Sequence, residues 1–244
     1  MITSSLVPKM VNFLIDYLTS GWGLQFLSAI GTSLMVAALG FISCIVIGIL
    51  CTLFARSGFR GSVALVNLYT YVFRSLPDIL LLILIFYTLD GAIQALLNLV
   101  PGMSDMRLSA YVPAVMSTSI VLGAYATELF RAGWADIPLG QHEAGRSLGF
   151  SPFQTLVLII LPQVYRKIIP HLGSLCLISM KETALLSIIG IPDIVRTASL
   201  GARSTGSPFV FYGIAIAIFV TFAILCSRIF AHLERSARQN RAGA

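Results

Sequence analysis

Residues 136–170 read DIPLGQHEAGRSLGFSPFQTLVLIILPQVYRKIIP and form a polar insertion between long apolar runs. Almost everything outside this insertion is apolar enough to lie in lipid. The insertion itself carries side chains that need water or a protein partner: Asp136, His142, Glu143, Arg146, Arg166 and Lys167. We therefore expect it to be the docking surface of the chain.

The composition of the whole chain indicates a membrane protein. Of its 244 residues, 57% are hydrophobic and 11% are charged, against about 25% charged in soluble domains. Each membrane crossing needs roughly 20 residues, so the expected fold is all-α with about five transmembrane helices. The net charge of +6 comes from bases that flank apolar runs, which indicates membrane topology rather than nucleic-acid binding. The four cysteines show neither a CxxC pair nor metal-ligand spacing, so no metal site is predicted.

The chain begins with an expected interfacial segment, residues 1–20, whose apolar side chains recur at helical spacing. The first span follows at about 23–54 and ends before Arg56 and Arg60, which places its end on the cytoplasmic side. Small residues along this span would let another helix approach closely.

The second span, at about 62–89, contains Arg74 and Asp78 on either side of Pro77. Charges at membrane depth normally face a cavity or a partner. One reading is an ion pair between Arg74 and Asp78, four residues apart. The other reading places Asp78 on a substrate pathway.

A polar connection then leads to the third span, at about 108–131, with a possible short helix at 92–99 before it. Glu128 and Arg131 are spaced to form a pair near the cytoplasmic interface. Tyr125 lies one turn deeper and is a candidate cavity residue.

The central insertion contains signals for a helix, a turn and a second helix. Pro138 is suited to start a helix that includes Gln141, and Gly149 is suited to end it. Ser151 and Pro152 are typical of a second helix start. Pro162 is expected to interrupt that second helix, so residues 136–163 should form a structured cytoplasmic projection.

The fourth span, at about 164–181, is expected to be short or bent, because few uncharged residues separate Lys167 from Lys181. A broken apolar piece at 183–191 ends at Pro192, and broken elements at membrane depth are typical of transporter substrate sites. An outer loop at 193–208, a fifth span at about 207–230 and a basic tail at 233–244 complete the chain. The transmembrane domain is thus expected over 21–232.

The distribution of the 16 Lys and Arg residues predicts the orientation. Four lie on the expected outer side and two in membrane segments, Arg74 and Lys181. The other ten lie on the inner side: Arg56, Arg60, Arg131, Arg146, Arg166, Lys167, Arg228, Arg235, Arg238 and Arg241. The N-terminus is therefore expected in the periplasm and the C-terminus in the cytoplasm.

The insertion resembles the signature loop of the permease subunits of ATP-binding-cassette importers, whose pattern is Glu-Ala-Ala, three residues, Gly, nine residues, Ile, one residue, Leu-Pro. The matching residues here are Glu143, Ala144, Gly149, Ile159, Leu161 and Pro162. Gly145 replaces the second Ala of the pattern, which should cost the helix about 1 kcal/mol while keeping the residue small.

This resemblance implies a multi-pass permease subunit of a bacterial inner membrane. Its short helix would dock on an ATPase subunit through the part of the pattern around Gln141, Glu143 and Gly149. The resemblance further implies a second permease subunit, identical or different, two ATPase subunits and a periplasmic amino-acid-binding protein. The chain has no GxxxxGK[ST] motif, so ATP and Mg²⁺ would bind the partner ATPase and the permease itself would need no cofactor.

The resemblance extends to the polar amino-acid subfamily, and most of all to histidine, lysine, arginine, ornithine and opine permeases. The segments that resemble this subfamily are YVFRSLPDILLLILIFY, LGAYATELFRAGWADIPLGQHEA and MKETALLSIIGIPDIVRTA. A cationic cargo in a low-dielectric cavity needs a counter-charge. Asp78 and Glu182 are the candidate acids, although Glu182 could instead pair with Lys181. The expected substrate contacts are Asp78, Tyr125, Glu182 and Arg74.

Two other classes compete with an importer subunit. A membrane enzyme is disfavoured because the three histidines are scattered and no nucleophile, base and orienting group occur together. An ion-coupled secondary transporter is disfavoured because five spans without an internal repeat do not make a self-contained carrier.

Overall fold

The computed structural model describes residues 21–99 and 108–239, and it contains helices and no strands within those ranges. The predicted interfacial segment at 1–20 lies outside the described residues. The elements are α2 (Gly23–Ala55), α3 (Ser62–Ser75), α4 (Asp78–Asn98), α5 (Tyr111–Ala135), α6 (Leu139–Ser147), α7 (Pro152–Thr155), a π-helical turn (Leu156–Ile160), α8 (Leu161–Glu182), a 3₁₀ turn (Thr183–Ser187), α9 (Ile194–Thr205) and α10 (Pro208–Gln239).

Five helical segments of the described chain are long and apolar enough to cross a membrane: Gly23–Ala55, Asp78–Asn98, Tyr111–Ala135, Pro152–Ser187 and Pro208–Ser236. This confirms the predicted all-helical fold and its five apolar spans. The second span differs from the prediction because α3 and α4 are separate helices. Leu76 is extended, with φ −98° and ψ 152°, as expected for a residue before proline. The 14 residues of α3 reach only about 21 Å at 1.5 Å per residue, too short to cross alone.

Three further boundaries differ from the sequence expectations. The proposed short helix at 92–99 is the last part of α4. The expected outer loop contains α9, which Asp193 caps by accepting a hydrogen bond from the Arg196 N–H at 2.8 Å. The last helix continues beyond residue 230 into the basic tail, because residues 231–239 contain neither Gly nor Pro to end it.

Helix α5 is the centre of the bundle and packs against α2, α3, α4 and α8. Small residues make this possible, as the pattern along the first span predicted. A Cβ added to Gly48 would lie 2.7 Å from the Ala126 Cβ, and one added to Gly123 would lie 2.7 Å from the Ile47 Cγ2. The backbones of α2 and α5 are therefore too close for larger residues at these positions.

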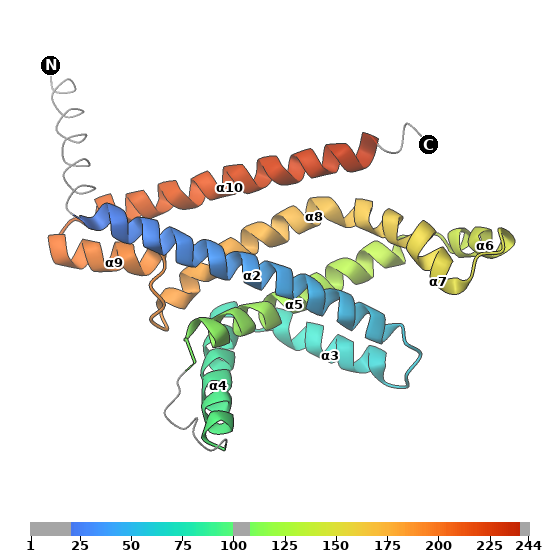
Figure 1. The fold of residues 1–244 in the computed structure, drawn as a ribbon, viewed down its shortest axis with the longest axis horizontal. Helices are drawn as coiled ribbons and strands as arrows, with labels where there is room; N and C mark the ends of the chain where they lie inside the picture. The colour runs from blue at the N-terminus through green and yellow to red at the C-terminus, as the bar shows by residue number, and fades with distance from the viewer. Residues whose placement is uncertain (1–20, 100–107, 240–244) are drawn as a thin grey trace.

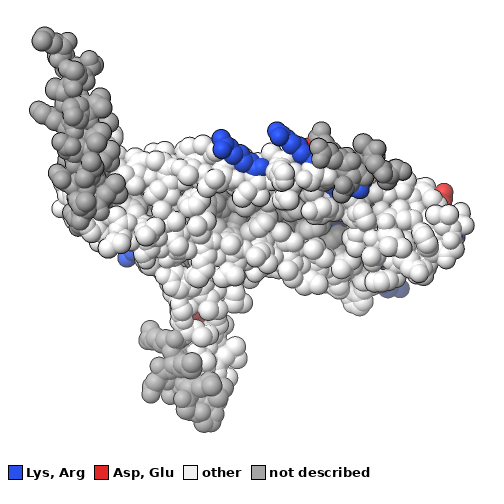
Figure 2. Space-filling view, turned by 45° about the horizontal axis from the view of Figure 1, so that its top comes forward, with Lys and Arg blue, Asp and Glu red and all other residues white. Residues whose placement is uncertain are grey.

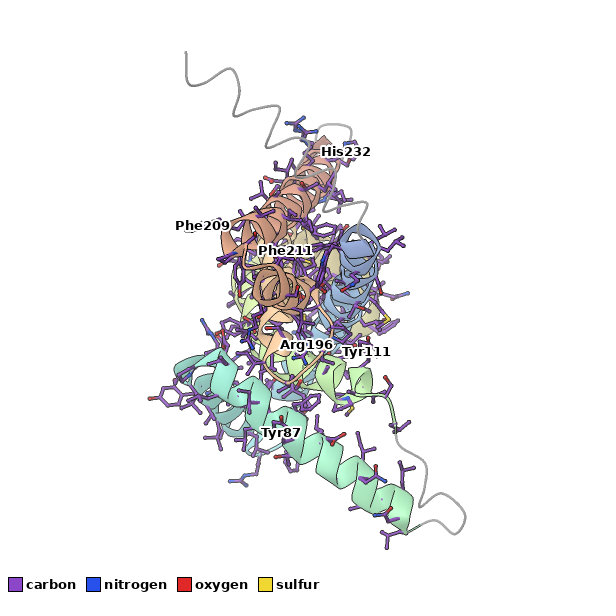
Figure 3. The ribbon with its side chains drawn as sticks, turned by 90° about the vertical axis from the view of Figure 1, so that its left-hand side faces the viewer. Tyr87, Tyr111, Arg196, Phe209, Phe211 and His232 are labelled. Carbon is purple, nitrogen blue, oxygen red and sulfur yellow. The ribbon has the colours of Figure 1, made fainter. Side chains whose placement is uncertain are left out.

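Different helices form the two ends of the bundle. In Figure 1, α6 and α7 lie at one end and α9 lies at the other, while α4 diverges from the remaining helices. The face drawn in Figure 2 is mostly uncharged. At the α9 end, Phe211 points inward, fully buried against Trp22, whereas Phe209 is 94% exposed (Figure 3).

Candidate functional site

The break at Pro77 places Asp78 at the start of α4, half-buried against α5. Its Oδ1 accepts a hydrogen bond from the Tyr125 hydroxyl at 3.1 Å. The two residues are 47 positions apart, so only the packing of α4 on α5 brings them together. The structure thus unites two of the predicted substrate contacts.

Glu182 lies at the end of α8 and is only 8% exposed. It is close enough to Asp78 for the two carboxyl groups to interact electrostatically. Its Oε2 is buried without a hydrogen-bond partner among the described residues. The alternative pairing with Lys181 is absent from the ion pairs of the described chain, and Lys181 is exposed. Burying a carboxylate without a partner is costly, so this site is suited to receive a cation.

Arg74 does not pair with Asp78, which corrects one of the two sequence readings. Its Nη1 lies 3.6 Å from the Glu128 Oε2, and its guanidinium lies 5.7 Å from the centre of the Tyr125 ring. The pairing at four residues requires a continuous helix, and the extended Leu76 interrupts it. Asp78 is therefore left without the neutralising arginine.

The predicted pair between Glu128 and Arg131 is present, with 3.2 Å between Oε1 and Nη1. Arg131 also donates to the Asn67 Oδ1 at 2.8 Å. Together with Arg74 these side chains line a polar cavity of about 590 Å³ between α3 and α5, whose lining consists of Asn67, Thr70, Tyr71, Arg74, Ser75, Tyr125, Glu128 and Arg131. Sequence reasoning missed Asn67, although its spacing from Arg74 places both on one face of a helix.

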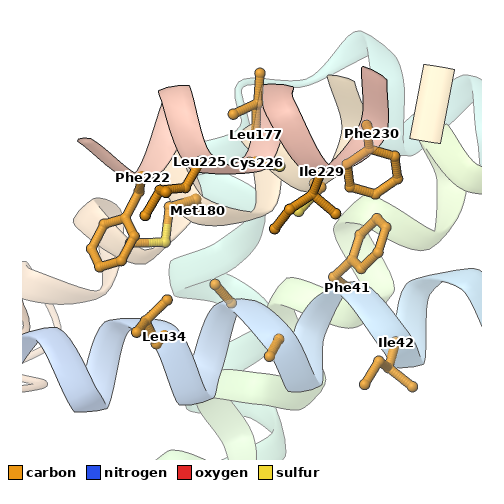
Figure 4. A pocket seen from close by; sticks show the side chains of 13 residues that line it. Leu34, Phe41, Ile42, Leu177, Met180, Phe222, Leu225, Cys226, Ile229 and Phe230 are labelled. Carbon is orange, nitrogen blue, oxygen red and sulfur yellow. The ribbon is translucent and has the colours of Figure 1, made fainter. Parts of the chain in front are cut away.

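Two other cavities are apolar and differ in kind from this site. The cavity between α2, α8 and α10 has a volume of about 380 Å³ and is lined by side chains such as Phe41, Met180 and Phe230 (Figure 4). The cavity beside Trp134 has a volume of about 440 Å³. Neither is lined by a charged residue, so neither offers a counter-charge for a cation.

The α6–α7 projection has the local structure that its sequence predicts. Helix α6 begins after Pro138. Gly149 adopts a left-handed φ of 78°, and the next residue, Phe150, donates its N–H to the Gly145 carbonyl at 3.0 Å. Ser151 and Gln154 then form a reciprocal capping box at the start of α7. The projection is therefore an ordered helix, turn and helix.

Two contacts attach α6 to the following helices. Gln163 donates from Nε2 to the Gln141 Oε1 at 2.8 Å. Gly145 is buried against Thr155, whose Cγ2 would lie 2.5 Å from a Cβ at this position. The opposite side of α6, with Glu143 and Ala144, is exposed.

Pro162 does not end the helical segment that starts at Pro152, contrary to the sequence expectation. It lies in the first turn of α8, directly after the π-helical turn. The irregular turn accommodates the missing proline N–H. Residues 152–187 consequently form one continuous helical segment.

Sequence reasoning also missed three exposed apolar side chains around Glu143. Leu139 is 80% exposed, Leu148 is 69% exposed and Phe153 is 72% exposed. Large apolar residues in a polar insertion are the signal that could have identified them, because such residues are normally buried.

The family of binding-protein-dependent transport system inner membrane components matches residues 44–239. This range covers well over half of the 244 residues. The chain belongs to this family. It is a permease subunit, a transport component of the inner membrane whose ATP hydrolysis takes place on a partner subunit.

The permease is similar to named relatives over most of its length. It is 32% identical to the nopaline transport system permease protein NocQ of Agrobacterium fabrum, over 93% of this chain and 96% of the relative. It is 32% identical to the histidine/lysine/arginine/ornithine transport system permease protein HisQ of Salmonella typhimurium, over 68% of this chain and 73% of the relative. These matches favour an importer subunit over an ion-coupled carrier or a membrane enzyme.

Solved structures share the fold of this permease. The crystal structure of an amino acid ABC transporter with histidines superposes with a TM-score of 0.75 and 27% identity, covering 89% of this chain and 96% of that chain. The inward-facing MetNI methionine ABC transporter superposes with a TM-score of 0.61 at 17% identity, which is a likeness of fold alone.

Proposed function

We propose that this permease carries cationic amino acids or opines, and that Asp78 and Glu182 supply the counter-charge for the cargo. The observation that carries the proposal is the buried Glu182 carboxyl group with an unpartnered Oε2, beside a second acid. A guanidinium or ammonium group between the two acids would offset their desolvation and mutual repulsion. Tyr125 orients Asp78 through its hydrogen bond, and Arg74 lies next to it.

The names of the relatives support this substrate class. Nopaline, octopine, histidine, lysine, arginine and ornithine occur in the names of similar permeases. All of these compounds carry a basic nitrogen group or are built on a basic amino acid. The acids of the site fit such groups, because a carboxylate accepts charge-assisted hydrogen bonds from guanidinium and ammonium donors.

The exposed side of α6 is the proposed coupling surface for the ATPase. Glu143 and Ala144 are its exposed polar and small residues, and Leu139, Leu148 and Phe153 are exposed apolar side chains of the same α6–α7 projection. Gly149 shapes the turn behind it, and the contacts of Gln141 and Gly145 hold it against the membrane helices. ATP and Mg²⁺ would bind on the partner, as expected for a permease without a phosphate-binding loop.

The same proposal includes the orientation and the assembly. The α6 end faces the cytoplasm with the C-terminus, and the α9 end faces the periplasm with the N-terminus. The membrane-embedded part of the permease begins at about residue 21 and ends within α10, whose last turns carry the basic residues Arg228 and Arg235. Two permease subunits, identical or different, would assemble with two ATPase subunits and receive cargo from a periplasmic amino-acid-binding protein.

Reconstituted transport tests this function. The permease, its ATPase and its binding protein would be placed in vesicles and supplied with labelled arginine, histidine, lysine, octopine, glutamate or leucine. We expect ATP-dependent uptake of basic substrates at least tenfold above that of glutamate. Uptake confined to acidic substrates would disprove the counter-charge argument.

A further inference from the structure

A row of charged side chains lies between the acids Asp78 and Glu182 and the α6 end of the bundle. On α5, Tyr125, Glu128 and Arg131 follow one another at three-residue intervals and share one face. On α3, Asn67 and Arg74 face them across the polar cavity. The cavity therefore begins at Tyr125, which bonds Asp78, and extends along α5 toward its end at Ala135.

The charges in this cavity form one connected network. Glu128 lies between two guanidinium groups, at 3.6 Å from Arg74 and 3.2 Å from Arg131. The side chains of Arg74, Glu128 and Arg131 remain 46%, 35% and 31% exposed, respectively. Charges at membrane depth normally line a cavity or face a partner, and these three line the same polar cavity.

The order of charges matches the backbone groups of a free amino acid. Its α-carboxylate can accept paired hydrogen bonds from a guanidinium group, and its α-ammonium can donate to a carboxylate. Arg74 and Arg131 provide two such donors on either side of the acceptor Glu128. Asp78 and Glu182 are both acidic, so they suit a cationic side chain but offer no partner for a carboxylate.

We propose that the polar cavity between α3 and α5 is a second cargo station, which binds the α-carboxylate and α-ammonium groups of the amino acid. The α-carboxylate binds Arg131 and Arg74, and the α-ammonium group binds Glu128. The station lies on the α6 side of the acids. It rests on the proposed function, in which that side is the exit, and it would hold the cargo after its side chain leaves Asp78 and Glu182.

Equilibrium binding to the purified complex with its ATPase subunits, in nanodiscs without nucleotide, tests the station. The probes are agmatine, which keeps the guanidinium and an ammonium group but has no carboxylate, and citrulline, which has both backbone groups but no cationic side chain. Arg131→Gln should weaken citrulline binding about tenfold, since one charge-assisted contact is lost, and should change agmatine binding less than twofold. Asp78→Asn should do the reverse.

Matched variants separate binding from assembly. Arg60→Gln removes a guanidinium from the exposed α2–α3 connection and should leave both probes unaffected. If Arg131→Gln fails to assemble with the ATPase, Glu128→Gln retains both arginines and should weaken citrulline about tenfold by loss of the ammonium contact.

The outcomes distinguish the two proposals. Absence of citrulline binding to the unaltered complex, or citrulline binding that survives both Arg131→Gln and Glu128→Gln, would overturn the station. Agmatine binding that is absent, or unaffected by Asp78→Asn, would overturn the counter-charge function. In that second case, citrulline binding that depends on Arg131 would still support the station.

Discussion

Two carboxyl groups in an apolar bundle repel one another, so Asp78 and Glu182 gain from a cation between them. The nearest arginine does not supply it, because Arg74 pairs with Glu128 instead. Tyr125 holds Asp78 through a neutral donor, which orients the carboxylate without cancelling its charge. Asp78 is therefore ordered while its charge remains available to the proposed cargo.

Asp78→Asn should lower the uptake of cationic amino acids about tenfold and that of neutral ones less than twofold. The substitution keeps an acceptor for Tyr125 but removes one charge-assisted contact with the cargo. Initial uptake rates in vesicles would measure the effect. Asp90→Asn is the control, because Asp90 is exposed on α4 at about 18 Å along the helix from Asp78. Equal losses for both substrate classes would contradict the role of Asp78.

The folding stability of the permease should depend on pH because the buried Asp193 carboxyl group at the α9 end titrates. Burial raises the pKa of its carboxyl group from 3.8 to about 6, although backbone N–H groups and Arg196 oppose the shift. The folded state therefore favours the protonated form. The stabilisation is full below about pH 4 and is lost as the pH rises through about 6, which amounts to about 3 kcal/mol for two pKa units.

Thermal unfolding in detergent between pH 4 and 7 measures this dependence. The unaltered permease should lose stability as the pH rises. Asp193→Asn keeps an oxygen to cap the Arg196 N–H but does not titrate, so its curve should be flatter. A variant with the same slope as the unaltered protein would assign the titration to another group.

At the scale of elements, α6 is a rigid projection whose outer side is free and whose inner side is attached. Glu143→Arg should reduce ATP-dependent uptake at least tenfold by placing the wrong charge on the coupling surface. Agmatine binding by the permease should be retained, because Glu143 is exposed on α6, whereas Asp78 and Glu182 lie on α4 and α8. Co-purification with the ATPase would report docking, and normal co-purification together with normal uptake would refute the assignment.

Gly145→Ala restores the family pattern but should destabilise this permease. Alanine favours the helix by about 1 kcal/mol, yet its Cβ would lie 2.5 Å from the Thr155 Cγ2. Overpacking of this kind costs about 1–3 kcal/mol. Thr155→Ala removes both atoms that would clash, the Cγ2 and the Oγ1 at 2.6 Å, so the double variant should recover stability in thermal unfolding. Equal losses in the single and double variants would show that Thr155 is not the cause.

At the scale of the whole molecule, the permease should depend on its partners for direction and energy. ATP on the partner and cargo on the permease must stabilise different conformations for transport to occur. Vesicles with permease, ATPase and ATP should therefore take up little arginine until binding protein is added outside. Uptake at the full rate without binding protein would contradict the importer function.

The amino-acid sequence by itself determined the features that depend on neighbouring residues. Five apolar runs predicted the number of spans, the signature around Glu143 predicted the family, and Gly149 and Ser151 predicted the turn of the projection. These signals are local, because they depend on backbone propensities and on hydrophobic length. Pro77 carried a local signal too, but one span was predicted over 62–89 where the structure has the two helices α3 and α4.

Only the tertiary structure decided which charges meet. In one continuous helix Arg74 could pair with Asp78. The break at Leu76 ends that helix, and Arg74 pairs with Glu128 of α5 instead. Whether Glu182 paired with Lys181 or lay buried beside Asp78 likewise depended on how α8 packs. Such contacts join residues far apart in the chain, and their geometry follows from the close approach of helices at small residues such as Gly48 and Gly123. The periodicity of a single helix does not contain that information.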